Sequence, residues 1–187
     1  MTLQRIVCYA LLVAAALVFL YSLGLMTDMH DNNFYLLSEY EIEGTEIYLN
    51  MQDFNRSLTA VGIALILLVL SQFVTQTHKR RKYYVANYIT VGATAVANIV
   101  AAVWALTEVF SYKAEYLLVD FESVAMWAQI LGKEYTESTF WFDAAAPVFA
   151  ILLAVTALSL LNLVFKIMVM KSERALLNLN REVKENA

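Results

Sequence analysis

Four long runs without a charged side chain dominate this sequence. They cover residues 6–27, 57–77, 83–107 and 144–165. Each run is longer than the roughly 20 apolar residues that cross the hydrocarbon core of a bilayer. Backbone amides in lipid must be hydrogen-bonded within their own segment, which selects helices, and no run alternates as a membrane barrel strand does. The sequence therefore predicts an all-α, polytopic membrane protein built as a four-transmembrane-helix bundle.

The composition agrees with lipid as the surrounding solvent. Of 187 residues, 60% are hydrophobic and 16% charged, whereas soluble domains have about 45–50% apolar and about 25% charged residues. The single cysteine, Cys8, excludes an intramolecular disulfide, a thiol redox pair and a cysteine zinc site. Because Cys8 lies in an apolar run, we expect it to act as a small buried hydrophobe. The first run is too long for the core of a signal peptide, and we interpret it as a retained helix.

The distribution of Lys and Arg predicts which ends face the cytoplasm. Arg5, the four basic residues of the loop 78–82 and the five of the tail 166–187 lie on one side, and three basic residues lie on the other. Because short basic loops stay inside, we expect cytoplasmic N- and C-termini. The two outer segments, 28–56 and 108–143, carry seven acidic residues each. This negative face argues against nucleic acid as a partner. We expect one membrane domain over residues 1–187, in a bacterial cytoplasmic membrane.

Both outer segments show helical periodicity. Apolar residues recur at i, i+4, i+7 and i+11 in the first segment and as a similar stripe in the second. We therefore expect amphipathic helical segments in both extracytoplasmic loops. Gly44 is the expected break in the first, and Gly132 is the expected C-cap in the second. We expect Asp143 to cap the fourth transmembrane helix and Pro147 to lie in its first turn. The stripes are Ile47, Met51, Phe54 and Leu58, and Leu117, Phe121, Val124, Ala128 and Leu131.

Aromatic residues crowd the outer segments. Such rings commonly form a belt at the depth of the lipid headgroups, and a platform for a carbohydrate or peptide is the alternative. The candidate outer interaction surface consists of Tyr48, Phe54, Phe121, Trp127 and Trp141.

One face of the third run is polar and small. Faces of this kind let membrane helices approach closely and hydrogen-bond. Packing inside the bundle or against another subunit is one interpretation, and the lining of a polar permeation path is the other. No run contains an ionisable residue that an ion or proton route would normally need at mid-membrane depth. Gln72 and Asn162 lie towards the inner ends of the second and fourth helices. The polar face consists of Asn87, Thr90, Thr94, Asn98, Ala101 and Ala105.

The tail continues the fourth helix with a narrow apolar seam. Leu176, Leu179 and Val183 are the expected cytoplasmic docking residues, although the seam is too short to sustain a coiled coil alone. A frayed helix end near the membrane is the alternative.

No combination of residues indicates catalysis, a cofactor or a metal site. His30 and His78 are expected on opposite sides of the membrane, and the oxygen-rich segment 28–33 lacks the glycine and distal glutamate of an EF-hand loop. We therefore expect no enzyme and no cofactor. The expected function is that of a non-catalytic accessory or assembly subunit of a larger membrane complex, with a transporter as one candidate for that complex. Its expected partners are the lipid bilayer and other membrane subunits or a second copy. The alternative is a small homo-oligomeric channel or transporter whose third helix lines the path.

Overall fold

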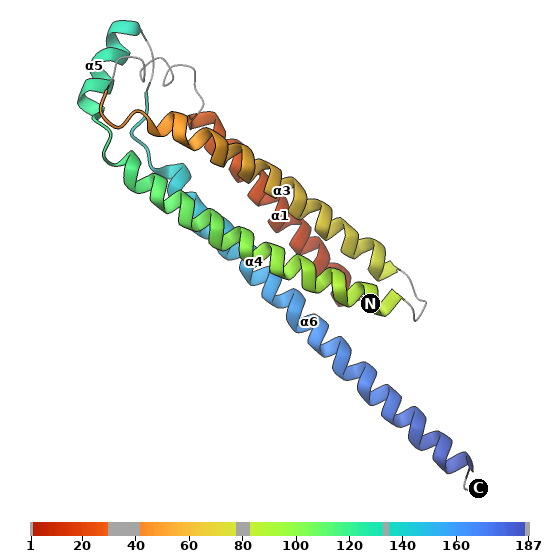
Figure 1. Ribbon diagram of the computed structural model, residues 1–187. Coiled ribbons are helices and arrows are strands. Elements are labelled where there is room, and N and C mark those ends of the chain that lie inside the picture. The colour runs from red at the N-terminus through yellow and green to blue at the C-terminus, as the bar shows by residue number, and fades with distance from the viewer. Residues whose placement is uncertain (1, 30–41, 78–82, 133–134, 186–187) are drawn as a thin grey trace.

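The computed structural model describes residues 2–29, 42–77, 83–132 and 135–185, and all five of its elements are helices. Four are long: α1 (Thr2–Met29), α3 (Ile47–Thr77), α4 (Tyr83–Tyr116) and α6 (Phe140–Glu185). The fifth, α5 (Phe121–Leu131), is short and lies between α4 and α6 in the sequence (Figure 1). The long helices contain four apolar stretches long enough to cross a membrane, so the predicted set of four spans is confirmed at the level of length and composition.

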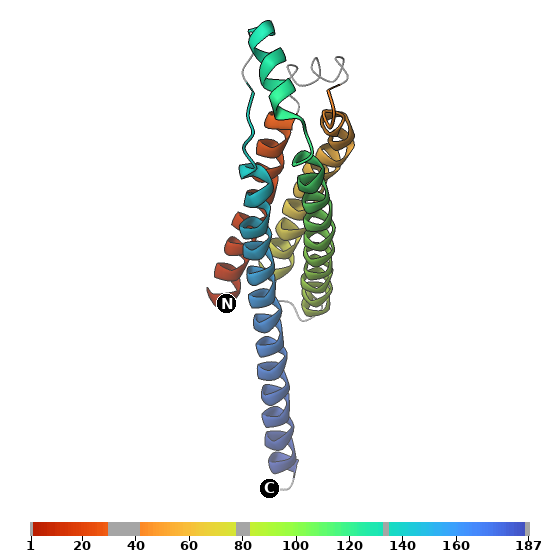
Figure 2. The same cartoon turned by 90° about the vertical axis from the view of Figure 1, so that its left-hand side faces the viewer.

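The four long helices form a ring. Helix α1 packs on α3 and α6, and α4 also packs on α3 and α6. Successive long helices run in opposite directions, and α6 continues well past the other three (Figures 1 and 2). At about 1.5 Å per residue, the 46 residues of α6 extend over about 69 Å, more than twice the thickness of a hydrocarbon core.

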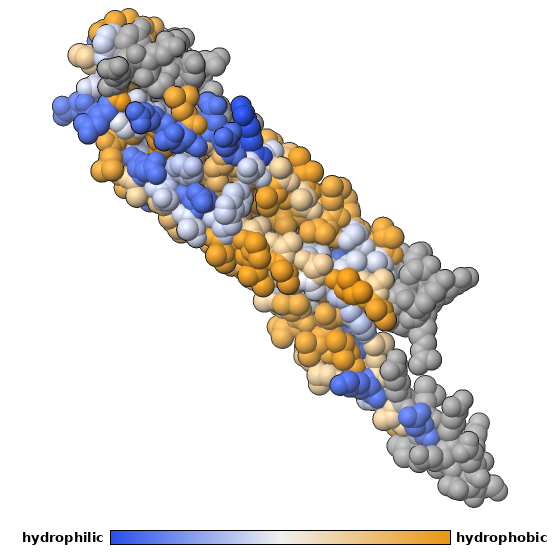
Figure 3. Space-filling model, in the orientation of Figure 1, coloured by the Kyte–Doolittle hydropathy of each residue, from blue (hydrophilic) through white to orange (hydrophobic). Residues whose placement is uncertain are grey.

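The two ends of the bundle differ in charge, and we name them accordingly. The basic end is where α1 and α4 begin and α3 ends, and it includes Arg5 and the projecting part of α6. The acidic end is where α3 and α6 begin, together with α5. A hydrophobic band lies along the bundle between them, and hydrophilic residues gather at the acidic end (Figure 3). The basic loop 78–82 and residues 30–41, which include His30, lie outside the described residues.

Several helix boundaries differ from the sequence expectation. Helix α6 begins at Phe140, so Asp143 lies in its first turn and the prediction that Asp143 caps it is wrong. The prediction that Pro147 lies in the first turn is wrong as well, because Pro147 lies one turn beyond Asp143. The start is instead fixed by Ser138, whose Oγ accepts from Phe140 N at 3.2 Å. Thr139 Oγ1 then donates to Asp143 Oδ2 at 2.7 Å. A short polar side chain that precedes the helix therefore satisfies an otherwise open amide.

The predicted stripe on α3 is confirmed, because Ile47, Met51, Phe54 and Leu58 are all buried. The described part of the first outer segment contains the start of α3, just after Gly44, which has φ 83°. In the second outer segment, Gly132 is the left-handed C-cap of α5 as predicted.

One member of the second stripe was placed wrongly. Val124 and Ala128 are buried, whereas Leu117 is exposed. The chain leaves α4 at Tyr116 and starts α5 only at Phe121, so Leu117 lies outside the helical register that the stripe assumed. The two outer segments meet at this break, where Asp120 N donates to Glu43 O at 3.1 Å.

Candidate functional site: a polar layer at the basic end

The polar face of α4 points into the interior of the bundle. Asn87, Thr94 and Asn98 are buried, as are Ala101 and Ala105, and Thr90 is half-buried. The two threonines return their hydroxyl groups to their own helix: Thr90 Oγ1 donates to Asn87 O at 3.1 Å and Thr94 Oγ1 to Thr90 O at 2.8 Å. This local bonding hides the hydroxyl protons from lipid.

Side-chain hydrogen bonds tie α4 to its neighbours. Asn98 Nδ2 donates to Thr156 Oγ1 on α6 at 2.8 Å, in a fully buried contact. Thr75 Oγ1 on α3 and Thr90 Oγ1 lie 3.0 Å apart, within hydrogen-bonding distance. Contacts of this kind contribute about 0.6 kcal/mol each on average in membrane proteins. They indicate that much of this face is already used inside the chain's own bundle.

Helix α1 adds Gln4 to this group of polar side chains. We call the group the polar layer; it consists of Gln4, Cys8, Gln72, Asn87, Thr90, Thr94, Asn98, Thr156, Ser159 and Lys166. Gln4 Nε2 donates to Asn87 Oδ1 at 3.2 Å, and Gln4 Oε1 accepts from Lys166 Nζ on α6 at 3.0 Å. A single side chain therefore links α1 with α4 and α6 near the basic end. About five turns of α6, at 3.6 residues per turn, separate Lys166 from the end of the helix at Glu185.

A small cavity lies beside this network. The cavity volume that the centre of a water-sized sphere can reach is about 10 Å³. Cys8, on its wall, donates from Sγ to Gln72 Oε1 at 3.4 Å, so the cysteine is buried as expected but also takes part in a polar contact. The lining residues are Gln4, Val7, Cys8, Gln72, Val91, Ser159, Asn162 and Leu163.

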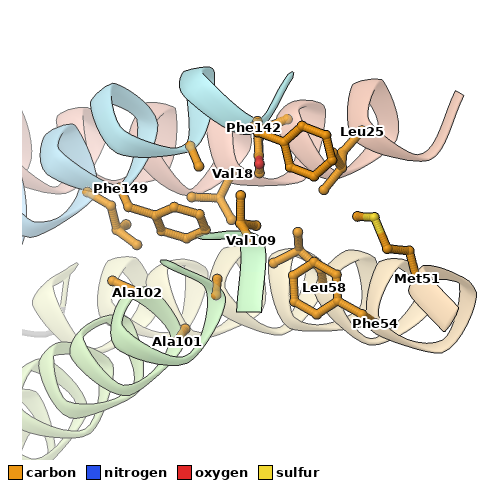
Figure 4. Packing of buried hydrophobic residues seen from close by; sticks show 14 of the residues in the cluster. Val18, Leu25, Met51, Phe54, Leu58, Ala101, Ala102, Val109, Phe142 and Phe149 are labelled. Atoms are coloured by element: carbon orange, nitrogen blue, oxygen red, sulfur yellow. The ribbon is translucent and has the colours of Figure 1, made fainter. Parts of the chain in front are cut away.

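The interior becomes mostly apolar towards the acidic end, although Ser22, Thr45 and Asn55 are also buried there. Val18, Ala102, Val109 and Phe149 lie in one cluster of buried hydrophobic residues between the helices (Figure 4). Tyr21 and Phe149 pack edge to face with ring centroids 6.0 Å apart. The polar layer thus gives way to mostly apolar packing towards the acidic end.

The five aromatic residues proposed as an outer surface occupy the acidic end. Tyr48 and Phe54 are buried, which leaves little of either ring open to a partner, and Phe121, Trp127 and Trp141 are partly buried and pack on the same core. The Phe54 ring lies 5.2 Å from that of Trp104. These rings hold the elements of the acidic end together.

Polar contacts reinforce the acidic end. Lys113 Nζ on α4 lies 2.6 Å from Asp143 Oδ1 on α6, and Tyr116 Oη donates to Thr136 O at 2.8 Å. Asp120 caps α5 by accepting from Ser123 N, and the side-chain hydrogen bond from Ser123 together with this one lowers the pKa of the Asp120 carboxyl.

The seam of the tail extends along the projecting part of α6. Leu176 is 61% exposed, whereas the side chains of Leu179 and Val183 lie outside the described residues. The last hydrogen bond that the structure shows from α6 to another helix joins Tyr88 Oη to Met170 Sδ at 3.4 Å. Beyond that point, α6 continues for about four turns at 3.6 residues per turn.

Five residues of the polar layer were not singled out by sequence reasoning as a group: Gln4, Cys8, Thr156, Ser159 and Lys166. Gln4 and Cys8 are four positions apart and so share one face of α1, which was the only available signal.

Among the described residues, no group of three or more His, Cys, Asp or Glu side chains is placed to hold a metal ion. Comparison of the chain with known protein families, curated proteins and solved structures gives no significant match.

Proposed function

We propose that this chain is a non-catalytic accessory or assembly subunit of a larger membrane complex. The observation that carries the proposal is the projecting part of α6, which continues beyond Met170 as a helix with an exposed Leu176. A helix that projects beyond the bundle presents its side chains to whatever lies at the basic end. An apolar stripe on such a helix is a common docking element for a partner helix or groove.

The interior of the bundle supports the same proposal over the alternative of a channel. The polar side chains of α4 pack within this one chain and hydrogen-bond to α3, α1 and α6. The hydrophobic cluster around Phe149 and Leu152 occupies most of the core towards the acidic end. A continuous polar path along α4 would have to cross that cluster.

We further propose that the basic end faces the cytoplasm and that the membrane is the bacterial cytoplasmic membrane. The excess of basic residues at this end supports the first assignment, because Lys and Arg in short loops determine orientation. A phosphatase or fluorescent reporter fused after Ala187 tests it. Fluorescence with no phosphatase activity is the expected result, and an active phosphatase would reverse the assignment.

Purification from native membranes in a mild detergent tests the accessory role. We expect unrelated membrane subunits to remain bound in fixed ratio through size-exclusion chromatography. Leu176→Glu should release them, because it places a charge on the exposed seam. Asn178→Glu is the matched control: it adds the same charge to an exposed position of the same helix, about 200° away around the axis at 100° per residue, and should leave the complex intact.

The channel alternative gives a different result. A symmetric homo-oligomer that conducts ions or solutes in liposomes, with flux altered by Asn98→Leu, would contradict the accessory role. If Leu176→Glu and Asn178→Glu retain the partners equally, the projecting helix is not the docking element.

A further inference from the structure

The cavity at the basic end has the size and the wall of a water site. Its volume of about 10 Å³ is at the lower limit for one water molecule. Empty cavities in proteins are normally lined by apolar groups, whereas buried waters lie among polar groups that lack other partners. Here Gln72 from α3, Cys8 from α1, and Ser159 and Asn162 from α6 line the same space.

Gln72 supplies the decisive group. The residue is 0% exposed, and its Oε1 accepts from Cys8 Sγ. Its Nε2, in contrast, has no hydrogen-bond partner among the residues that the structure describes. A buried amide donor without a partner carries its full desolvation penalty, and that penalty is larger in a membrane-embedded bundle, where lipid supplies no acceptor.

We propose that this cavity is a hydration site in which one water molecule accepts a hydrogen bond from Gln72 Nε2. The water donates its own protons to polar groups on the α6 side of the wall, where Ser159 and Asn162 lie. It therefore bridges α3 to α6 across the ring, a pair of helices that are not direct neighbours in the bundle. Together with Gln4, which links α1, α4 and α6, it completes a polar layer that joins all four long helices.

The single cysteine makes this water measurable. Cys8 is the only thiol in the chain and lies on the cavity wall, so its S–H stretching band reports on this site alone in an infrared spectrum. The full-length protein, reconstituted in liposomes, is transferred from H₂O to D₂O. A water in the cavity that exchanges with solvent delivers deuterons to Cys8 Sγ, and the S–H band should be lost before the backbone amides of the four spans exchange. Cys8→Ala identifies the band.

Two variants separate a hydrated cavity from a dry one. Ser159→Val fills the cavity with methyl groups and should retain the S–H band over the time in which it is lost from the unchanged protein. Ser71→Val is the matched control, because Ser71 is half-buried on α3, donates to its own helix at Leu68 O and lies outside the cavity wall. Its thiol should exchange as in the unchanged protein.

The unfolding midpoint of Gln72→Met gives an independent readout. If a water satisfies Gln72 Nε2, the substitution removes a satisfied polar network and should lower the midpoint. A dry site predicts the opposite, because removing an unpaired buried donor relieves its desolvation penalty. A raised midpoint for Gln72→Met, or a thiol band that persists as long as the amides of the spans, would overturn the proposal.

Discussion

Gly24 on α1 lies against the Trp141 indole of α6, and this contact gives the sharpest test of the packing. A Cβ atom added at Gly24 would lie 2.1 Å from Cη2 and 2.2 Å from Cζ3 of the Trp141 indole. Carbon atoms in contact normally lie about 3.5–4.0 Å apart. The indole would therefore have to move by more than about 1 Å. The Trp141 ring is packed against Phe140 and Tyr21, so this movement also disturbs other aromatic contacts.

The expected cost follows from two opposing effects. Alanine is favoured over glycine inside a helix by about 0.8–1.0 kcal/mol, and overpacking a well-filled interface costs about 1–3 kcal/mol. Gly92, inside α4, provides the matched control, because a Cβ there would meet nothing within 4 Å. The intrinsic preference is the same in both helices. The difference in unfolding free energy between Gly24→Ala and Gly92→Ala should therefore be about 1–3 kcal/mol.

The two variants can be compared by thermal or denaturant unfolding in one detergent. Gly92→Ala should be neutral or slightly stabilising, and Gly24→Ala should be the less stable of the two. A double-mutant cycle with Trp141→Phe identifies the cause, because phenylalanine lacks the outer ring atoms that clash. In that background, Gly24→Ala should lose its penalty. Equal stability of the two alanine variants, or a penalty that persists with Trp141→Phe, would show that the close approach of α1 and α6 is not as described.

Three further perturbations test other parts of the structure. Gly44→Ala should destabilise the acidic end by about 1–2 kcal/mol, since L-residues are disfavoured in left-handed conformations; its φ is 83° and its added Cβ would lie 2.8 Å from Val119 Cα, and faster amide exchange in α5 is the expected readout. Asn98→Leu should cost about 0.6–1.7 kcal/mol of unfolding free energy through loss of the bond to Thr156, and in the accessory-subunit interpretation it should leave partner retention unchanged. Because Ser123 lowers the pKa of Asp120 below its ordinary value of 3.8, the charged carboxylate favours the capped α5. That contribution is complete above pH 3.8 and is lost as pH falls through the lowered pKa. Asp120→Asn should remove this acid dependence of amide exchange in α5 while leaving the helix capped at neutral pH.

The sequence was sufficient to predict the four long helices because lipid imposes a simple rule on composition. A run without charge that is long enough to cross hydrocarbon must form a helix. The same rule could not predict where the helices end. Glu108 ends the uncharged run of residues 83–107, but α4 continues past it and past Lys113 to Tyr116. Charged residues are well accommodated in a helix that has left the hydrocarbon, so the chemical boundary and the helix boundary differ.

The inward direction of the polar face on α4 could not be decided from the sequence. A stripe of small and polar residues packs equally well on the chain's own helices and on another subunit, since the contacts are chemically the same. The position of Thr156 opposite Asn98 depends on the axial register of α6 against α4. Register between transmembrane helices is set by the fit of many side chains, and no single pattern within α4 encodes it.

The polar layer and the mostly apolar packing towards the acidic end should respond differently to force or to a partner. Apolar packing around Phe149 is lost gradually as helices separate, because dispersion contacts are numerous and individually weak. The polar layer behaves differently, since Gln4, Asn87 and Lys166 are joined by directional hydrogen bonds that break when geometry changes and leave buried groups unpaired. Helix α6 carries Lys166 and continues directly into the projecting segment. A partner that bends or rotates that segment therefore acts first on the contact between Met170 and Tyr88, and next on the polar layer through the hydrogen bond between Lys166 and Gln4.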